Sequence, residues 1–153
     1  MDRWAVLQNQ YSLLHRWEVE PELLELCKRF GMGMMTYSPL AIGLLTGRFR
    51  RGHAIPSDSP WANNVERFKS FMTTETDLLI HRMQEIASLK EISTAQLAIA
   101  WLIDKDGITA PIIGPDKPEH IDELLTAVDV RLTKEERTEL DSLSDWDRYS
   151  KIS

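Results

Sequence analysis

The stretch Pro21-Glu-Leu-Leu-Glu-Leu-Cys-Lys-Arg-Phe-Gly-Met-Gly-Met-Met-Thr-Tyr37 decides the fold class, because its apolar residues change from a helical to an extended period. Pro21 to Phe30 carries its apolar residues on one helical stripe. Proline suits the first helical turn, where its missing N–H is not needed. Gly31 predicts the end of this helix, and Gly33 to Tyr37 is then predicted to be a buried strand.

Working outward from this stretch, the sequence alternates between further strands and helices. Strands are predicted at Trp4 to Gln8 and at Ile108 to Ile113. Strands separated by helices indicate an α/β fold with a parallel sheet and right-handed crossovers. The remaining helices are predicted over Thr74 to Lys90, from a Ser93/Gln96 capping box to Ile103, from Asp116 with Glu119 to Ala127, and from a Thr133/Glu136 capping box to about Leu143.

Residues 38–73 form the longest segment without a clear period, and they include Pro39, Pro56 and Pro60. Loops of this length inside a domain are usually either functional or disordered. We therefore expect a long loop next to the second strand.

Composition limits the class of protein. The chain has 153 residues, with 18 Lys or Arg against 24 Asp or Glu and a net charge of −6, which argues against a nucleic-acid-binding protein. Apolar and charged fractions of 42% and 27% are typical of one soluble globular domain. Neither a membrane-spanning stretch nor a signal peptide is recognised, so the sequence predicts a cytoplasmic protein with no membrane partner.

Metal and disulfide chemistry are not predicted. The single cysteine, Cys27, excludes an internal disulfide framework. The histidines lack the spacing of a pair of metal ligands on one helix, so no metal site is expected. They are His15, His53, His81 and His120.

The segment Tyr37-Ser-Pro-Leu-Ala-Ile-Gly-Leu-Leu-Thr-Gly-Arg48 is the strongest candidate for a ligand site. An aromatic residue and a serine at the carboxyl end of a parallel strand lie where βα loops build such sites. Arg48 can meet a phosphate, and the helix after Gly114 presents free N–H groups that favour an anion. Together these features favour a dinucleotide phosphate site. The alternative is an ordinary turn followed by a normally capped helix.

Several motifs in order give the chain a resemblance to a known family. They are Val6 to Leu14, Tyr37 to Leu40, Leu45 to Gly47, Gln96 to Leu102, Pro111 to Gly114, Val128 to Thr133, and Leu140 with Asp141. Over nearly its whole length the chain resembles the C-terminal half of an aldo-keto reductase domain, so residues 1–153 are interpreted as that half and residues 38–73 as a long cofactor-side loop. The resemblance implies a partial TIM (β/α)8 barrel, namely about the last three βα units plus a C-terminal helix. It also implies an oxidoreductase that transfers hydride between NADP(H) and a small carbonyl substrate.

The resemblance also implies which residues bind the cofactor. Gln8 matches the glutamine that hydrogen-bonds the nicotinamide carboxamide, and Tyr37 matches the aromatic residue that stacks on the nicotinamide ring. The pyrophosphate loop corresponds to Ser38, Pro39, Leu40, Gly43 and Arg48. The 2′-phosphate and adenine positions correspond to Gly114, Asp116, His120, Glu123 and Leu124.

This last group departs from the family pattern. The family usually has Ser or Arg where Asp116 stands, Gln or Arg at His120, and Asn at Leu124. A carboxylate repels a phosphate, so NAD is a possible cofactor beside NADP(H). Lys117 can restore part of the attraction for phosphate.

No residue of this chain matches the family's catalytic Asp, Tyr, Lys and His, which the resemblance places in the N-terminal half of the barrel. A full barrel needs about 250 residues, so the chain is expected to require the N-terminal half or to self-associate through its open sheet edges. A non-catalytic nucleotide-binding or structural fragment is the alternative.

Overall fold

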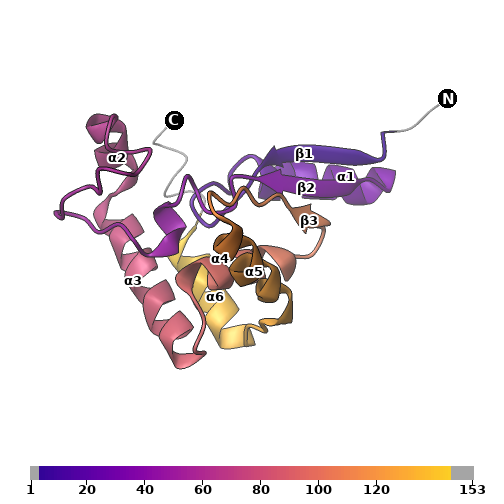
Figure 1. Cartoon of the computed structure of the whole chain (residues 1–153). Coiled ribbons are helices and arrows are strands. Elements are labelled where there is room, and N and C mark those ends of the chain that lie inside the picture. Colours follow the sequence, from indigo (N-terminus) through magenta and orange to yellow (C-terminus); the bar gives the residue numbers. More distant parts are fainter. Residues whose placement is uncertain (1–3, 146–153) are drawn as a thin grey trace.

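Three strands within the described residues form one parallel sheet, as the sequence predicts. The computed structural model describes residues 4–145 and gives an α/β arrangement (Figure 1). The strands are β1 (Val6–Gln10), β2 (Gly33–Tyr37) and β3 (Ala110–Pro111), in the order β1-β2-β3. Within the described part of the chain, β1 and β3 are therefore the two edges of the sheet, which confirms the predicted edge positions.

The strand bounds differ from the prediction at both edges. β1 runs to Gln10 rather than to Gln8, because its pairing with β2 continues in register to Tyr37. β3 has two residues and pairs only through Ala110 and Pro111. Pro111 has no N–H to donate, which limits how far a ladder can extend.

The two faces of the sheet have different surroundings. Met34 and Thr36 are fully buried on the face that α1 covers. Because side chains alternate along a strand, Val6 and Gln8 of β1 share the opposite face with Tyr37 of β2. All three are exposed, so this face lies open in the described structure.

The predicted helices are present, with local differences. A π-helical turn at Val19–Leu23 leads into α1 (Leu24–Phe30), and Gly31 ends it in the left-handed conformation with φ 64°. Both predicted capping boxes form, at Ser93 with Gln96 and at Thr133 with Glu136. The other helices are α2 (Val65–Phe71), α3 (Thr74–Leu89), α4 (Thr94–Ile103), α5 (Pro118–Leu125) and α6 (Lys134–Leu143).

One prediction about the helices is wrong, and one segment contains more structure than the sequence indicates. The segment 38–73 is mostly irregular, as predicted, but it contains the 3-10 turn η2 (Leu44–Thr46) and the helix α2. Asp116 does not cap α5: the N-cap is Lys117, without a side-chain capping bond. Pro118 holds the first helical position and restricts the preceding residue to extended backbone, which fixes the start of α5 one residue later.

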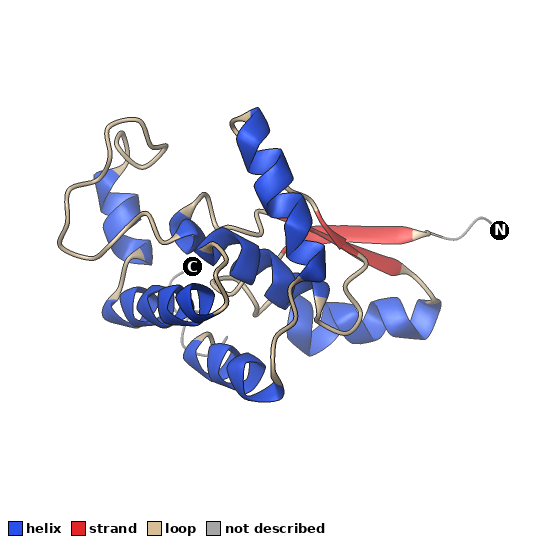
Figure 2. Cartoon of the chain, turned by 60° about the horizontal axis from the view of Figure 1, so that its bottom comes forward, coloured by secondary structure: helices blue, strands red, loops and turns tan. Residues whose placement is uncertain are grey.

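The main core lies between the helices beside the sheet. Nearly every residue of α4 is buried, and α3 and α6 pack against each other. Figure 2 shows the helices gathered beside the strands. Among the described residues no single helix is long and apolar enough to cross a membrane. α3 and α4 pass that length and composition test only as a pair, which is bent by 95°.

Candidate functional site

The open face of the sheet carries the first two predicted site residues. Gln8 and Tyr37 share this face on neighbouring strands. Gln10 is the register partner of Tyr37, and Gln8 precedes Gln10 by two residues on β1. Tyr37 is the last residue of β2 and its side chain is 40% exposed. The structure therefore brings an exposed amide and an exposed aromatic ring to one face, close to the carboxyl ends of the strands.

The loop that follows Tyr37 has an unusual backbone. Ser38, Ala41 and Ile42 have positive φ values of 54°, 48° and 55°, and Gly43 has φ 81°. Positive φ is rare for residues other than glycine, and for β-branched Ile42 it is a clear outlier. Such conformations cost free energy and cluster at functional sites.

Contacts within the loop hold this backbone in place. The Trp61 indole N–H donates to the Ile42 carbonyl at 2.9 Å, and the Ala41 N–H donates to the Ser38 carbonyl at 2.9 Å. The N–H groups of Leu40 and Ile42 make no hydrogen bond within the described residues. These two N–H groups, separated by the bonded Ala41 N–H, are therefore available to a ligand.

The other two predicted cofactor-binding residues of this loop, Pro39 and Arg48, are held by other parts of the chain. The Pro39 side chain is buried. The Arg48 guanidinium forms an ion pair with the Asp58 carboxylate, and both groups are exposed. Because an exposed pair of this kind contributes little stability, Arg48 can exchange Asp58 for a phosphate at small cost.

The five predicted adenosine-side residues follow β3, the strand next to β2. Gly114 and Asp116 are exposed, His120 is half-buried, and the Glu123 carbonyl accepts a hydrogen bond of 3.0 Å from the Gln96 side chain. Leu124 is only 5% exposed and belongs to the hydrophobic core. Its side chain therefore anchors α5 to the core and offers almost no surface to a ligand.

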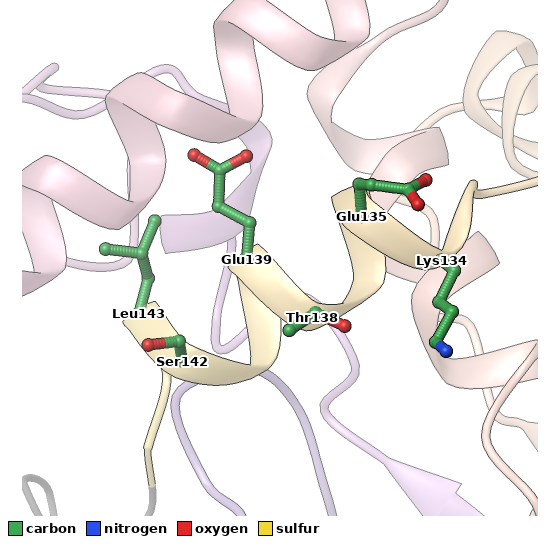
Figure 3. A pocket seen from close by; sticks show the side chains of 6 residues that line it. All are labelled: Lys134, Glu135, Thr138, Glu139, Ser142 and Leu143. Atoms are coloured by element: carbon green, nitrogen blue, oxygen red, sulfur yellow. The ribbon is translucent and has the colours of Figure 1, made fainter.

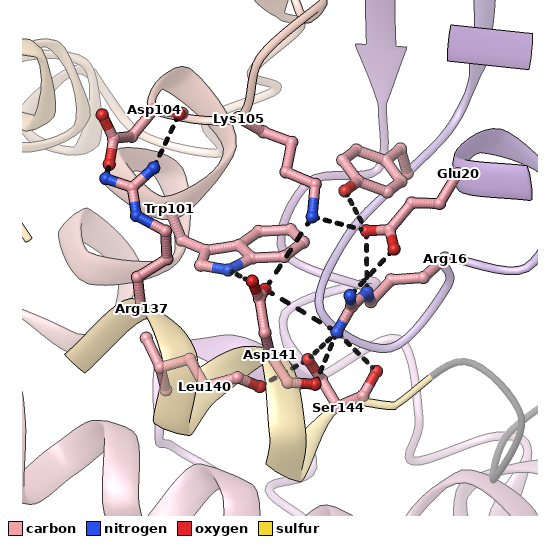
Figure 4. A network of polar contacts seen from close by, with 10 residues as sticks. Arg16, Glu20, Trp101, Asp104, Lys105, Arg137, Leu140, Asp141 and Ser144 are labelled. Atoms are coloured by element: carbon pink, nitrogen blue, oxygen red, sulfur yellow. Dashed lines mark hydrogen bonds and ion pairs between the residues drawn. The ribbon is translucent and has the colours of Figure 1, made fainter. Parts of the chain in front are cut away.

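A buried polar network near the end of β1 is a feature that the sequence reading missed (Figure 4). The Arg16 guanidinium donates to both Glu20 carboxylate oxygens at 2.8 Å and to the Ser144 hydroxyl at 2.8 Å. The Tyr11 hydroxyl donates to Glu20 at 2.5 Å, and Lys105 lies 3.1 Å from the same carboxylate. The network joins the segment after β1 to the ends of α4 and α6.

Burial and charge fix the protonation states in this network. Burial would raise the pKa of the Glu20 carboxyl, but hydrogen bonds from Arg16 and Tyr11, and the charges of Arg16 and Lys105, hold that pKa below its ordinary value. Burial, and then the charge and hydrogen bond of Glu20, raise the pKa of Tyr11 far above its ordinary value. Tyr11 is fully buried, so its hydroxyl is a structural donor with no access to a substrate.

The aromatic ring of Trp101 lies at the centre of the network. Arg16 and Lys105 each lie 5.5 Å from its ring centre, and Tyr11 packs against it at 5.5 Å. Its indole N–H donates to the Asp141 carboxylate at 2.9 Å. Only the short spacing from Arg16 to Glu20 was visible in the sequence, because the other partners are far away along the chain.

Two surface depressions are lined by residues other than the predicted cofactor-binding ones. One is a shallow groove whose lining side chains all come from α6 (Figure 3). The other is lined by Arg51, Gly52, Phe68, Lys69, Met72, Thr74 and Asp77. Neither contains Gln8 or Tyr37, and the residues described hold no group of three or more potential metal ligands.

Comparisons with known proteins agree with the motifs. The model of the "Aldo/keto reductase family" matches residues 1–145. The chain is 35% identical over 125 residues to L-glyceraldehyde 3-phosphate reductase of Escherichia coli (strain K12), which covers 79% of this chain and 36% of that protein. It is 35% identical over 140 residues to an aldo-keto reductase of Alternaria alternata, which covers 92% of this chain and 36% of that protein.

A further relative carries a different name. The chain is 38% identical over 129 residues to a "probable voltage-gated potassium channel subunit beta" of Oryza sativa subsp. japonica, with 82% of this chain and 38% of that protein covered. The chain thus spans between a third and two fifths of the length of these curated relatives. With a family match over 145 residues and several relatives above 30% identity, the chain belongs to the aldo-keto reductase family of oxidoreductases.

Proposed function

We propose that residues 1–153 are the C-terminal half of an aldo-keto reductase domain and supply its nicotinamide-cofactor-binding part. In this proposal β1, β2 and β3 are the last three strands of a (β/α)8 barrel, and the open face of the sheet is part of the barrel interior. The parallel order of the strands and the two unpaired edges support it. So do the matches to individual relatives, each of which covers little more than a third of the relative.

The observation that carries the proposal is the placement of Gln8 and Tyr37 on one exposed face beside the strained loop. The Gln8 amide can donate to and accept from a carboxamide, and the Tyr37 ring offers a flat surface that shields one face of a planar ring from water. The bound nicotinamide cofactor supplies the hydride for a carbonyl substrate. Residues 38–73 form the cofactor-side loop, in which Ser38, Leu40, Gly43 and Arg48 hold the pyrophosphate and buried Pro39 fixes the turn.

The adenosine end of the cofactor is assigned to the segment after β3. Gly114 leaves room for the ligand, since an added Cβ there would meet nothing within 4 Å. Asp116, His120 and Glu123 lie at the 2′ position and the adenine, and Leu124 supports them from the core. NADP(H) is the proposed cofactor, and NAD remains an option because Asp116 repels a 2′-phosphate.

Catalysis requires more than this chain. Carbonyl reduction needs a proton donor at the developing alkoxide, and Tyr11 is excluded because it is buried and bound to Glu20. The catalytic Asp, Tyr, Lys and His that the family resemblance implies are assigned to an N-terminal half, so the proposal makes the isolated chain inactive. The complete enzyme acts on a small-molecule carbonyl compound in the cytoplasm.

A titration of the 153-residue chain with NADPH, followed by cofactor fluorescence, tests this proposal. Tyr37→Ala should weaken binding about tenfold or more, as the loss of one stacked ring does. Trp4→Ala is the control, because it removes an 85% exposed aromatic side chain that precedes β1. Equal affinities for both variants would refute the assignment of Tyr37.

The potassium channel subunit among the relatives favours a second candidate, in which this chain belongs to a subunit of a larger assembly. In that candidate the chain binds the nucleotide without carbonyl turnover. Adding an N-terminal half to the chain distinguishes the two candidate functions. A reductase then consumes NADPH with a nitrobenzaldehyde-type carbonyl, whereas a binding subunit retains NADPH without consuming it.

A further inference from the structure

A cavity with both charged and apolar walls lies beside α2. It is the depression described above whose lining begins at Arg51 and ends at Asp77, and its volume is about 550 Å³. Its walls come from the loop before α2, from α2 itself and from the first turn of α3. Figure 1 shows α2 and α3 on the side of the chain away from β1 and β2. Volumes of about 300–1,000 Å³ are usual for sites that bind small organic molecules. We call this depression the α2 cavity.

One wall of the α2 cavity is apolar. Phe68 and Met72 lie four residues apart, on one side of α2 and its C-terminal cap, and are 5% and 3% exposed. The Phe68 ring also packs against the rings of Phe49 and Trp61, with centroids 5.8 and 6.0 Å apart, so packing holds this wall in place. An aromatic ligand suits such a wall, because its ring makes favourable contacts with a neighbouring ring and with a methionine thioether.

The side chain of Arg51, in the wall of the α2 cavity, is free to bind an anion. Arg51 is exposed, and no other described residue forms an ion pair or a hydrogen bond with its guanidinium. Its backbone N–H, in contrast, donates to the Asp77 carboxylate at 3.0 Å. This bond fixes the backbone of Arg51 beside the cavity and leaves the guanidinium available. A guanidinium presents parallel N–H donors that match the two oxygens of a carboxylate.

The two other charged groups of the cavity do not exclude an anion. The Asp77 carboxylate accepts hydrogen bonds from Arg50 through both oxygens, at 2.9 and 3.3 Å, so its charge is compensated within the protein. Lys69 pairs with Glu66 at 2.8 Å, but both side chains are exposed, and an ion pair of this kind contributes little stability. Lys69 can therefore turn to a bound anion at small cost.

We propose that the α2 cavity binds a small aromatic carboxylate. The two carboxylate oxygens accept hydrogen bonds from Arg51, and Lys69 supplies a second positive charge. The ring lies against Phe68 and Met72. A monoanion fits better than a phosphate dianion, because Asp77 lines the same cavity and repels a second negative charge more strongly. This site goes beyond the proposed function, since none of its residues is a predicted cofactor-binding residue and binding requires no nucleotide.

A set of matched ligands tests the charge and the ring separately on the 153-residue chain, with affinities measured by ligand-observed NMR. Benzoate carries both features and should bind. Benzamide keeps the ring but has no charge, and should bind at least about tenfold more weakly. Acetate keeps the charge but has no ring, and should bind at least about fivefold more weakly. Benzamide or acetate binding as tightly as benzoate, or phenyl phosphate binding more tightly, would overturn the assignment.

Methionine methyl groups report where benzoate binds. In a chain labelled with ¹³C at the methionine methyl groups, the ring current of bound benzoate should shift the resonance of Met72. Met35 is the register partner of Gln8 on the open face of the sheet, and its resonance should not move. A shift of Met35 in place of Met72 would put benzoate on the open face and refute the site in the α2 cavity.

Variants of the cations complete the test. Arg51→Gln should lower the affinity for benzoate about tenfold, and Lys69→Gln should lower it about threefold. The matched control is Arg29→Gln, the same change at an exposed arginine of α1, which should leave the affinity unchanged. All three side chains are exposed, so the thermal unfolding of the variants should match that of the wild type. Equal effects of Arg51→Gln and Arg29→Gln would show that binding follows net charge alone and would refute the role of Arg51. No nucleotide is present in these measurements, so their outcome is independent of whether the chain binds NADPH.

Discussion

The Gln84 side-chain amide donates a hydrogen bond of 2.9 Å to the Gly47 carbonyl and so fastens the end of the loop after β2 to α3. The same nitrogen limits what can stand at position 47. A Cβ added to Gly47 would lie 2.9 Å from Gln84 Nε2 and 3.0 Å from Thr94 Oγ1. With a φ of 77°, Gly47 is constrained by both its backbone and its neighbours.

Gly47→Ala should therefore destabilise the chain more than an ordinary substitution at positive φ. Gly52→Ala is the matched control, because Gly52 has φ 78° but an added Cβ there meets nothing within 4 Å. Left-handed backbone alone should cost about 1–2 kcal/mol in Gly52→Ala, and the overpacking at Gly47 should add about 1–3 kcal/mol. Urea unfolding followed by tryptophan fluorescence measures both, and equal losses would contradict the clash at Gly47.

Arg16→Ala should strongly destabilise the fold, because it removes two hydrogen bonds to the buried Glu20 carboxylate and those to the Asp141 and Ser144 carbonyls at the end of α6. The Arg16 and Glu20 side chains are only 7% and 14% exposed. Removing one partner of a buried pair typically costs about 3–5 kcal/mol. Arg29→Ala, at an exposed arginine of α1, is the control and should change the free energy of unfolding by less than about 1 kcal/mol. A comparable loss in the two variants would show that the network contributes no special stability.

Glu20 should make stability depend on pH on the acid side. Its pKa is lowered in the native state from an ordinary value of 4.5, so below pH 4.5 the unfolded chain binds a proton that the native chain does not. The stabilisation is therefore complete above pH 4.5 and is lost as pH falls toward the native pKa.

Glu20→Gln should remove this part of the slope in the free energy of unfolding between pH 6 and pH 3. Asp77 and Asp106 also have lowered pKa values, through their hydrogen bonds with Arg50 and Lys28 respectively. The slope they cause remains in both proteins, so the difference between wild type and variant is the quantity to compare. If the free energies of unfolding of wild type and Glu20→Gln differ by the same amount at every pH from 6 to 3, the lowered pKa of Glu20 is contradicted.

Asp116→Arg should increase the preference for a 2′-phosphate. The change replaces a repulsive charge by an attractive one, and an affinity gain of about tenfold corresponds to 1.4 kcal/mol. Titrating the chain with 2′,5′-ADP and with 5′-AMP measures the phosphate contribution alone. Glu135→Arg makes the same charge change on α6 and should alter neither affinity. Equal gains from both variants would indicate a general charge effect instead.

Much of the helical structure could be predicted because its signals are local. The Ser93/Gln96 box needs only residues three apart, and its hydrogen bonds form within one turn. Gly31 similarly ends α1 through its own backbone conformation. The parallel sheet followed from the alternation of strand and helix patterns.

The features that the sequence did not reveal depend on distant contacts. The N-cap of α2, Asn64, makes no side-chain capping bond. Phe68 of α2 packs against Phe49 and Trp61 from the preceding loop. Tertiary packing, rather than propensity, stabilises such a short helix. The start of α5 was predicted one residue too early, because Pro118 makes Lys117 rather than Asp116 the N-cap. The site face could be predicted only through the resemblance, since spacing alone did not pair Gln8 with Tyr37.

The bond between Arg16 and Ser144 joins residues 128 positions apart, and this separation has a consequence for the order of folding. A contact of such high sequence separation costs the most chain entropy to close and tends to form late. During synthesis Arg16 leaves the ribosome long before its partners at the end of α6 exist. The guanidinium can pair with Glu20 as soon as both are made, but its bonds to Asp141 and Ser144 form only when the last helix docks, so these bonds complete the contacts around Trp101 late in folding.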